Sequence, residues 1–324
     1  METQLKQRIC TAGVLLAILA GALYLGYWGI SVLSVAAYLC ISWEFYSMKK
    51  DCTLTAKIVP IIISIVFLVS FGSNLFFPEF SMPVILAIML ISLPSILLVP
   101  LFFTLFAIYC CWQVNKVGLN AKVVKRLSDH TWLGIFYIWI LGSITFLSPL
   151  LFLTAHISNV HMIGILIVIF SDTFAYFGGK KFGKSLCSPN ISPKKTWAGV
   201  YFGLLGSIVA LSLYLHIQSY FFDYHNSIRV AIIEEYIFGR GSYYASFPII
   251  EGLILGIVAQ FGDLFESLIK RINGVKDSGN LLPGHGGVLD RLDALLFVVP
   301  FIIASMMVIG IVAIINAMPF GTLL

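Results

Sequence analysis

The sequence predicts an all-α fold, a polytopic membrane bundle of about nine transmembrane helices. Of the 324 residues, 59% are hydrophobic and only 11% are charged, whereas a soluble domain is about 25% charged. The apolar residues form long continuous runs instead of short alternating segments, which favours helices over a β-barrel. No polar stretch is long enough to hold a core of its own, so no soluble domain is expected.

Nine apolar segments approach the length of about 20 residues that a membrane-spanning helix needs. They cover residues 9–27, 29–48, 57–77, 82–112, 132–154, 161–178, 197–216, 248–269 and 294–318. A tight turn around Gly26 and Trp28 is expected to join the first two. The fourth segment is longer than one span requires, and Pro94 and Pro100 predict a kink in it, because proline removes a backbone donor.

The distribution of lysine and arginine predicts the orientation of the bundle. These residues gather in alternate loops, at 49–56, 113–131, 179–196 and 270–293. By the positive-inside rule the N-terminus is then inside, the C-terminus outside, and the four loops face the cytoplasm. The net charge of +5 is explained by orientation, so no nucleic-acid partner is expected. The six cysteines include no C-x-x-C pair, so neither a zinc site nor a disulfide framework is indicated.

Four aspartates lie at or near the cytoplasmic ends of apolar segments: Asp172, Asp263, Asp290 and Asp293. A charge within a membrane segment costs about 3 kcal/mol on insertion scales, so four carboxylates at one depth are expected to share a cation. Carboxylate oxygens beside phosphates favour Mg²⁺. Asp290 and Asp293 are three residues apart and would share one helix face. Taken singly, each aspartate could equally cap a helix or pair with a lysine.

Basic residues in the same loops exceed what orientation requires. They are Lys194, Lys195, Lys270, Arg271 and Lys276. Gly284, Gly286 and Gly287 would let backbone amides approach an anion closely, although a plain loop is the alternative. His285 is expected to contact phosphate or to support the metal site, unless it is only a loop residue. Carboxylates, bases and glycines together indicate phosphoryl or nucleotidyl transfer, in which positioning and charge stabilisation dominate catalysis.

Three stretches of these loops resemble the phosphatidate cytidylyltransferases, also called CDP-diacylglycerol synthases. SLIKRINGVKDSGNLLPGHGGVLDRLD, residues 267–293, is similar to the family signature position for position. SDTFAYFGGKKFG, residues 171–183, resembles its central motif, and ISPKKTW, residues 191–197, resembles its basic loop. The family often has glutamate after this tryptophan, where the present chain has Ala198, and the effect of that departure stays open.

The resemblance covers roughly the C-terminal half of the chain. It therefore divides the sequence into N-terminal transmembrane helices at residues 1–130 and a catalytic transmembrane region at residues 131–324. It implies that CTP and phosphatidic acid react to give CDP-diacylglycerol and pyrophosphate, a nucleotidyl transfer in phospholipid biosynthesis. Acyl-chain preference and the choice between CTP and dCTP stay open.

The resemblance also implies roles for individual residues. Asp263, Asp290 and Asp293, with Asp172 contributing, would hold Mg²⁺, and whether one cation or two are bound stays open. Asp263, Lys270, Asp290 and Asp293 would be catalytic. The side chains expected to bind substrate are Ser267, Arg271, Lys276, His285, Arg291, Lys194 and Lys195. A homodimer is implied as well. The lipid would enter sideways from the surrounding membrane lipids, and a bacterial inner membrane with the active site on its cytoplasmic face is expected.

Three other functions were weighed against this one. A CDP-alcohol phosphotransferase needs a D-G-x-x-A-R arrangement, which the sequence lacks. A lipid kinase that uses CTP would share much of the chemistry but transfer the γ-phosphoryl group. An ion transporter would place acids at mid-membrane in two related halves, whereas these acids gather at one face and no repeat is visible.

Overall fold

The computed structural model describes residues 2–48, 157–221 and 243–305, together with 101, 104–106 and 108–118. Its elements are, in chain order, α1 (Glu2–Tyr24), α2 (Gly26–Met48), α8 (Ile157–Phe182), β1 (Leu186–Ser188), β2 (Ser192–Thr196), α9 (Trp197–Phe221), α11 (Tyr243–Ile272) and α12 (Leu289–Leu292). Residues 108–117 are helical, and an apolar helix, Leu295–Ser305, follows α12. The predicted segments 57–77 and 132–154, and most of 82–112, lie outside the described residues.

The helices predicted at 9–27, 29–48, 161–178, 197–216 and 248–269 are confirmed, with ends that differ by several residues. Three of them contain stretches long and apolar enough to cross a membrane, Met162–Phe182, Trp197–Ile217 and Pro248–Ile272. Shorter apolar stretches lie in α1, in α2 and in the last described helix. The described part of the chain is therefore mostly helical and contains helices that could cross a membrane, as the composition predicts.

The loop predicted at 179–196 differs from the all-α expectation. Helix α8 continues to Phe182, and the chain then forms a two-stranded antiparallel sheet in which Leu186 pairs with Thr196 and Ser188 pairs with Ser192. Strand β2 is polar and contains Pro193, so it does not extend a helix, and the backbone groups of this segment pair across the two strands instead. The side chain of Ile191, at the turn, is fully buried and fixes the hairpin to the bundle.

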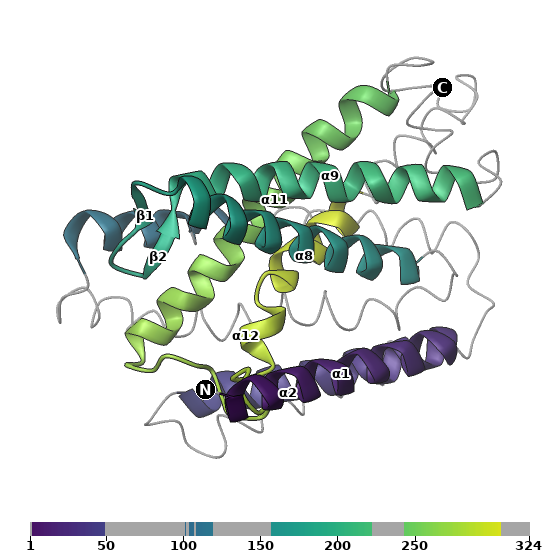
Figure 1. The fold of residues 1–324 in the computed structure, drawn as a ribbon, viewed down its shortest axis with the longest axis horizontal. Helices are drawn as coiled ribbons and strands as arrows, with labels where there is room; N and C mark the ends of the chain where they lie inside the picture. The colour runs from purple at the N-terminus through teal and green to yellow at the C-terminus, as the bar shows by residue number, and fades with distance from the viewer. Residues whose placement is uncertain are drawn as a thin grey trace, which may run out of the picture.

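Helices α8 and α9 run side by side, with the hairpin β1–β2 at one end (Figure 1). Glycine makes the close approach possible, because a Cβ added at Gly206 would lie 2.5 Å from the backbone oxygen of Phe170. The rings of Phe182 and Phe202 stack with centroids 5.3 Å apart. The two helices thus hold the hairpin in a defined place at the end of the bundle.

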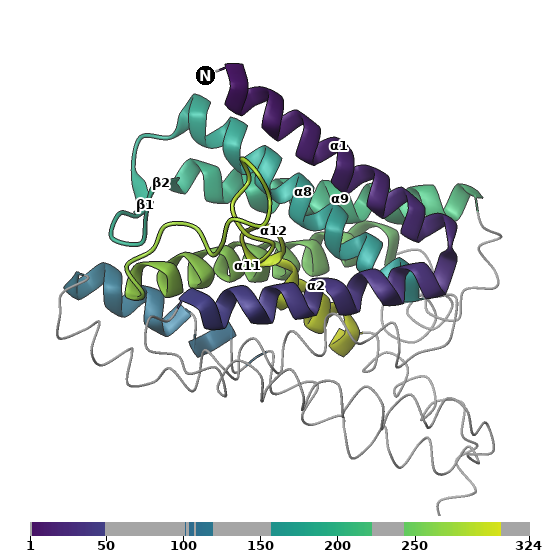
Figure 2. The ribbon, with the colours of Figure 1, turned by 90° about the horizontal axis from the view of Figure 1, so that it is seen from below.

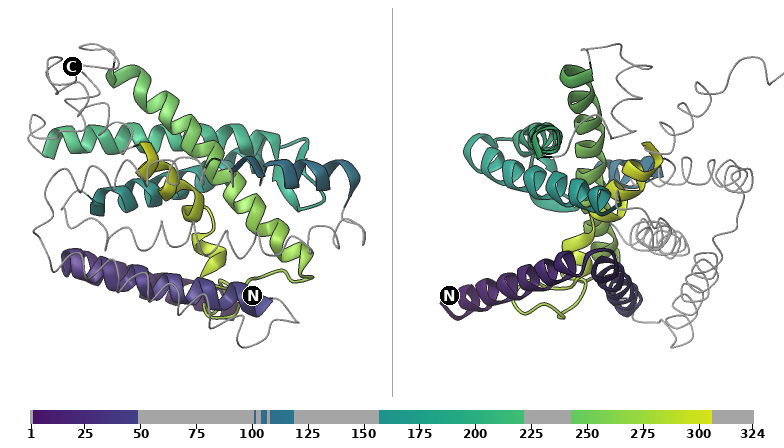
Figure 3. Two further views of the ribbon diagram at one scale, coloured as in Figure 1. Left: turned by 180° about the vertical axis from the view of Figure 1, so that it is seen from behind. Right: turned by 90° about the vertical axis from the view of Figure 1, so that its right-hand side faces the viewer.

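The last described helix, Leu295–Ser305, forms the centre of the core. Leu296, Phe297, Val298 and Val299 follow one another in sequence and all four are fully buried. A helix that is apolar and buried on every side is surrounded by other helices. Figure 3 shows this helix, in yellow, alongside α11, where the rings of Phe265 and Phe297 are in contact. Because α12 directly precedes it, the core fixes the position of the acidic segment at residues 290–293.

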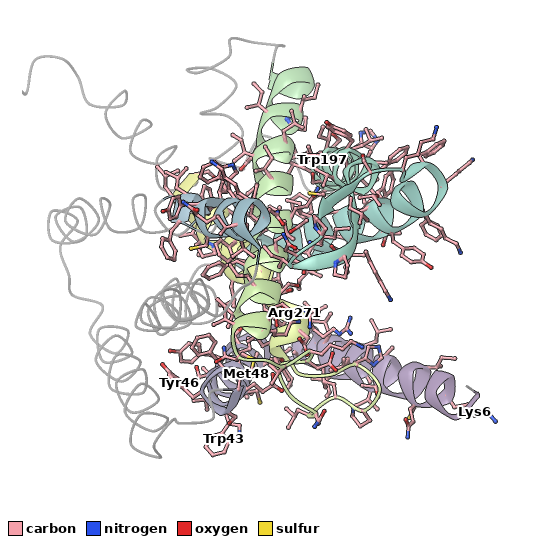
Figure 4. The ribbon with its side chains drawn as sticks, turned by 90° about the vertical axis from the view of Figure 1, so that its left-hand side faces the viewer. Lys6, Trp43, Tyr46, Met48, Trp197 and Arg271 are labelled. Atoms are coloured by element: carbon pink, nitrogen blue, oxygen red, sulfur yellow. The ribbon has the colours of Figure 1, made fainter. Side chains whose placement is uncertain are left out.

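Helices α1 and α2 contact each other near the turn that joins them and diverge from there (Figure 2), and α11 crosses the bundle toward α2 (Figure 1). Figure 4 shows Arg271, near the end of α11, on the side of the molecule where Trp43, Tyr46 and Met48 mark α2. After α11 the chain folds back as residues 273–288, here called the signature loop, and enters α12 beside α2 (Figure 2). The N-terminal helices therefore border the segment that carries most of the predicted site.

Candidate active site

An ion pair joins the hairpin to α11 at the centre of the candidate site. Lys195 Nζ, on β2, lies 2.7 Å from Asp263 Oδ2, and both side chains are about a third exposed or less. Ser267, one turn further along α11, donates its hydroxyl to Asp263 Oδ1 at 3.5 Å. The predicted residues Lys195, Asp263 and Ser267 are thus brought together from two separate segments of the sequence.

Two further aspartates act on the same lysine. Asp293 and Asp172 both interact electrostatically with Lys195, as Asp263 does. Burial alone would lower the pKa of Lys195, but the three carboxylates outweigh burial and hold its pKa above the usual value. Three carboxylates thus act on one ammonium group, while Asp172 also interacts electrostatically with Arg291 and Asp293 with Lys270.

Asp293 occupies the most enclosed position of the three. It is the residue that ends α12, its side chain is buried, and its Oδ1 accepts the N–H of Ala294 at 2.8 Å. Burial first, and then repulsion from Asp263, raise the pKa of Asp293. Taking a carboxylate out of water without a partner cation is costly, which makes this residue the strongest local reason to expect a bound cation.

A second lysine organises a neighbouring group of acids. Lys270 Nζ lies 2.5 Å from Glu266 Oε2, one turn earlier on α11, and 2.6 Å from Asp290 Oδ1 on α12. Glu266 is fully buried, and Asp293 interacts electrostatically with both Glu266 and Lys270. The four predicted aspartates are therefore divided between two lysines, with Asp293 between the two groups.

The signature loop closes around the carboxylate of Asp290. Asp290 Oδ2 accepts the N–H of Ser278 at 2.9 Å and the N–H of Gly287 at 2.8 Å. Burial would raise the pKa of Asp290, but the bonds from Lys270, Gly287 and Ser278 outweigh it and hold the pKa below the usual value. Gly286 adopts φ +86°, and a Cβ there would lie 2.6 Å from Asp290 Oδ2. Two of the three glycines expected to approach a phosphate, Gly286 and Gly287, lie against a carboxylate of the protein in this structure.

A glutamate from the N-terminal helices reaches the same loop. Glu44, on α2, is buried, with 5% of the residue exposed. Its Oε1 accepts the N–H of Val288 at 3.0 Å, and its Oε2 accepts the N–H of Leu289 at 2.9 Å and the hydroxyl of Ser278 at 3.3 Å. The first turn of α12 is therefore capped by a side chain more than two hundred residues away in sequence.

The remaining predicted residues lie at the edge of these groups. Arg271 donates to the backbone oxygens of Ile191 at 3.3 Å and Val275 at 3.4 Å, so it ties the hairpin to the signature loop. Arg291 donates to the backbone oxygen of His285 at 2.8 Å. Within the described part of the chain, His285 Nδ1 is buried without a hydrogen-bond partner. The side chains of Lys194 and Lys276 are exposed.

A metal cage is not preformed among the residues that the structure describes, where no group of three or more histidine, cysteine, aspartate or glutamate side chains is arranged to hold a metal ion. The chemistry of the donors nevertheless suits a hard cation. Asp172, Asp263 and Asp293 offer carboxylate oxygens, the ligands that Mg²⁺ prefers, and they outnumber the single ammonium group they share.

The sequence reasoning missed two acids of the site, Glu44 and Glu266. Both lie inside apolar segments, where an ionisable residue marks a functional position by default. Glu266 also stands four residues before Lys270, a spacing that pairs opposite charges on a helix. An acid within an apolar segment, and for Glu266 the spacing to Lys270, were therefore the signals in the sequence that could have identified these two residues.

Comparison with known proteins identifies relatives along nearly the whole chain. The sequence model described as "Cytidylyltransferase family" matches residues 6–309. A phosphatidate cytidylyltransferase of Rickettsia typhi is 40% identical over 161 residues, which cover 48% of this chain and 62% of the relative. Phosphatidate cytidylyltransferase 5, chloroplastic, of Arabidopsis thaliana is 29% identical over 329 residues, 91% of this chain and 70% of the relative. A phosphatidate cytidylyltransferase of Thermotoga maritima is 43% identical over 129 residues, 40% of this chain and 42% of the relative.

The matched lengths of the three relatives differ. The aligned part spans less than two thirds of the Rickettsia and Thermotoga proteins and rather more of the plant protein. The family match begins at residue 6 and so includes α1 and α2. The similarity expected for the C-terminal half thus extends, at the level of the family, to the N-terminal helices.

Proposed function

Because the chain belongs to the cytidylyltransferase family, we propose that it is a phosphatidate cytidylyltransferase, a nucleotidyltransferase of phospholipid biosynthesis. In the proposed reaction an oxygen of the phosphatidic acid headgroup attacks the α-phosphorus of CTP. The bond from that phosphorus to the β-phosphate oxygen breaks, CDP-diacylglycerol forms and pyrophosphate leaves. The observation that carries this proposal is the Lys195–Asp263 ion pair, 2.7 Å long, which joins the stretch at residues 191–197 to α11 just before the stretch at residues 267–293.

The chain's own residues would act mainly by placing charge. The attacking phosphate oxygen is already anionic at neutral pH, so no strong general base is required. The reaction instead needs cationic groups where negative charge accumulates, and preorganised charges of this kind commonly supply the largest part of catalysis. Lys195 and Lys270 would hold phosphate oxygens within the site, while Lys194, Lys276 and Arg291 lie exposed at its rim and would attract the nucleotide.

We propose Mg²⁺ as the cofactor, held by Asp263 and Asp293 with Asp172 contributing. Bound there, the cation would offset the repulsion between the two anionic substrates and stabilise the pyrophosphate. The support for this proposal is the excess of carboxylates around Lys195. Asp290, the fourth expected ligand, would have to exchange the ammonium group of Lys270 for the cation.

The arrangement in the membrane follows from the same proposal. We infer nine spans, an internal N-terminus and an external C-terminus, with the hairpin and the signature loop on the cytoplasmic face, where CTP is present. The phosphatidic acid would then reach the site from the cytoplasmic leaflet of a bacterial inner membrane. Lysines and arginines in these loops support this orientation. A homodimer remains part of the proposal through the family resemblance.

The test follows two phosphorus atoms of CTP separately. Detergent-purified protein is incubated with phosphatidic acid and Mg²⁺ and with CTP labelled at either the α or the γ position. The proposal expects α-label in a lipid that migrates with CDP-diacylglycerol and γ-label in pyrophosphate. Label from the γ position in lipid would instead identify a CTP-dependent kinase, and no label in lipid would contradict both readings.

A matched pair of variants connects this assay to the site. Asp263→Asn removes a carboxylate beside Lys195 and should lower label transfer about 100-fold. Asp277→Asn removes a carboxylate from the exposed part of the signature loop and should leave transfer close to that of the unaltered protein. Equal activity of the two variants would mean that the reaction does not depend on Asp263 and takes place at another site.

A further inference from the structure

We propose that Glu44 is a positioning residue, through which the N-terminal helices hold the signature loop and the start of α12 in the geometry that the reaction needs. This inference rests on the proposed function. The motifs of the site all lie beyond residue 170, so nothing in them assigns a role to α2. The contacts of Glu44 supply that role.

Glu44 accepts three hydrogen bonds from the signature loop and the start of α12. The two carboxylate oxygens of Glu44 accept the N–H groups of Val288 and Leu289 and the hydroxyl of Ser278. Val288 and Leu289 begin α12, and the residue at the cap position of this helix makes no side-chain cap of its own. The N–H groups at a helix start need acceptors from elsewhere, and here Glu44 supplies them.

Glu44 and Asp290 accept hydrogen bonds from the same short segment of the chain. Ser278 donates its N–H to Asp290 and its hydroxyl to Glu44. The N–H of Gly287 goes to Asp290, while those of the next two residues go to Glu44. Two carboxylates therefore divide the donors of one short turn, and the position of Asp290 next to Lys270 depends on the position of Glu44.

The carboxylate of Glu44 lies close against two glycines of the signature loop. A Cβ at Gly279 would lie 2.8 Å from Glu44 Oε1, and a Cβ at Gly287 would lie 2.5 Å from Glu44 Oε2. Real Cβ atoms do not approach other atoms so closely, because interiors are packed to contact. The loop thus has glycine at two positions where the side chain of Glu44 enters it.

Helix α1 contacts the same loop independently of Glu44. Thr11 donates its hydroxyl to the backbone oxygen of Pro283 at 2.9 Å. The N-terminal helix pair therefore contacts the signature loop at its tip, through Thr11, and at its return into α12, through Glu44. The segment between these contacts contains His285, whose Nδ1 is buried without a hydrogen-bond partner among the described residues.

The test combines amide exchange with substrate kinetics on full-length protein in detergent. Glu44→Gln keeps the length of the side chain but turns one acceptor into a donor that faces an N–H group. Hydrogen–deuterium exchange of the peptide containing Val288 and Leu289 should accelerate about tenfold, while exchange in α8 and α9 stays unchanged. In the cytidylyl transfer assay, the KM for CTP should rise about tenfold.

The KM separates positioning from a purely structural role. A variant that only lowers the amount of folded protein lowers the apparent kcat and leaves the KM for CTP unchanged, and that result would overturn the proposal. Unchanged exchange at Val288 and Leu289 would overturn it as well. Asp277→Asn, which removes an exposed carboxylate from the same loop, is the matched control and should change neither quantity.

The role of Glu44 can be tested separately from the cytidylyl transfer activity. If the unaltered protein transfers no cytidylyl group, the proposed function fails, whereas the exchange measurement still decides whether Glu44 holds the loop. If Glu44→Gln does not fold, Ser278→Ala removes only the longest of the three bonds and should change both quantities two- to threefold. No change in either quantity for Ser278→Ala would then overturn the proposal.

Discussion

Lys270 Nζ lies 2.6 Å from Asp290 Oδ1, twenty residues further along the chain, and so joins α11 directly to α12. The same ammonium group pairs with Glu266. The signature loop leaves α11 shortly after Lys270 and returns just before Asp290, so this ion pair closes the loop at its base. The contact gives the lysine a structural task in addition to its expected contact with phosphate.

Replacing Lys270 with methionine should destabilise the protein. The substitution keeps the unbranched chain up to the ε position but leaves Glu266 and Asp290 buried without their ammonium group. Removing one partner of a buried ion pair costs about 3–5 kcal/mol. We expect a clear drop in the thermal unfolding temperature in detergent, whereas Lys276→Met, at an exposed position of the same loop, should unfold close to the original temperature. Equal unfolding temperatures for the two variants would contradict this view of the loop.

Gly287→Ala tests how tightly the signature loop is packed. The added methyl group would meet Ser278 Oγ and lie 2.5 Å from Glu44 Oε2. Forcing an extra carbon into a filled site costs about 1–3 kcal/mol, so both stability and activity should fall. Gly13→Ala on α1, where an added Cβ meets nothing within 4 Å, should be neutral or slightly stabilising. A Gly287→Ala protein as stable as Gly13→Ala would show that the loop is not packed as described.

The lowered pKa of Asp290 predicts a particular pH dependence. A carboxyl group whose pKa is lower in the folded protein stabilises the fold at pH values above its unfolded pKa, about 3.9, and this contribution disappears as the pH falls through the folded pKa. The difference in unfolding temperature between the original protein and Asp290→Asn should therefore stay constant from pH 8 to pH 5 and shrink only in stronger acid. A difference already lost at pH 6 would mean that the pKa is raised.

The sequence predicted the helices and the chemistry better than it predicted the contacts. Long apolar runs predict spans because the bilayer requires them, and α8, α9 and α11 follow that rule. The hairpin at residues 186–196 was missed because its strands have only three and five residues, too few to show an alternating pattern. The division of the aspartates between Lys195 and Lys270 depends on how α8, β2, α11 and α12 pack, which periodicity along one segment does not contain.

The N-terminal helices illustrate the same limit. Their sequences were interpreted as apolar spans, and Glu44 stood within one of them without a visible partner. The partners lie at residues 278, 288 and 289, and only the packing of α12 beside α2 brings them together. Single acids within apolar spans are therefore worth treating as site candidates in sequences of this kind.

We propose, above all, that cytidylyl transfer takes place beside the ion pair of Lys195 and Asp263. The most direct test is a double-mutant cycle on kcat/KM for CTP, with Lys195→Gln, Asp263→Asn and the combined variant. Each single change should lower kcat/KM about 100-fold, the usual effect of removing one preorganised charge. Because the two groups act as a unit, the combined variant should be little worse than either single one. Losses that simply multiply, or a single variant that keeps at least half of the original activity, would contradict the claim.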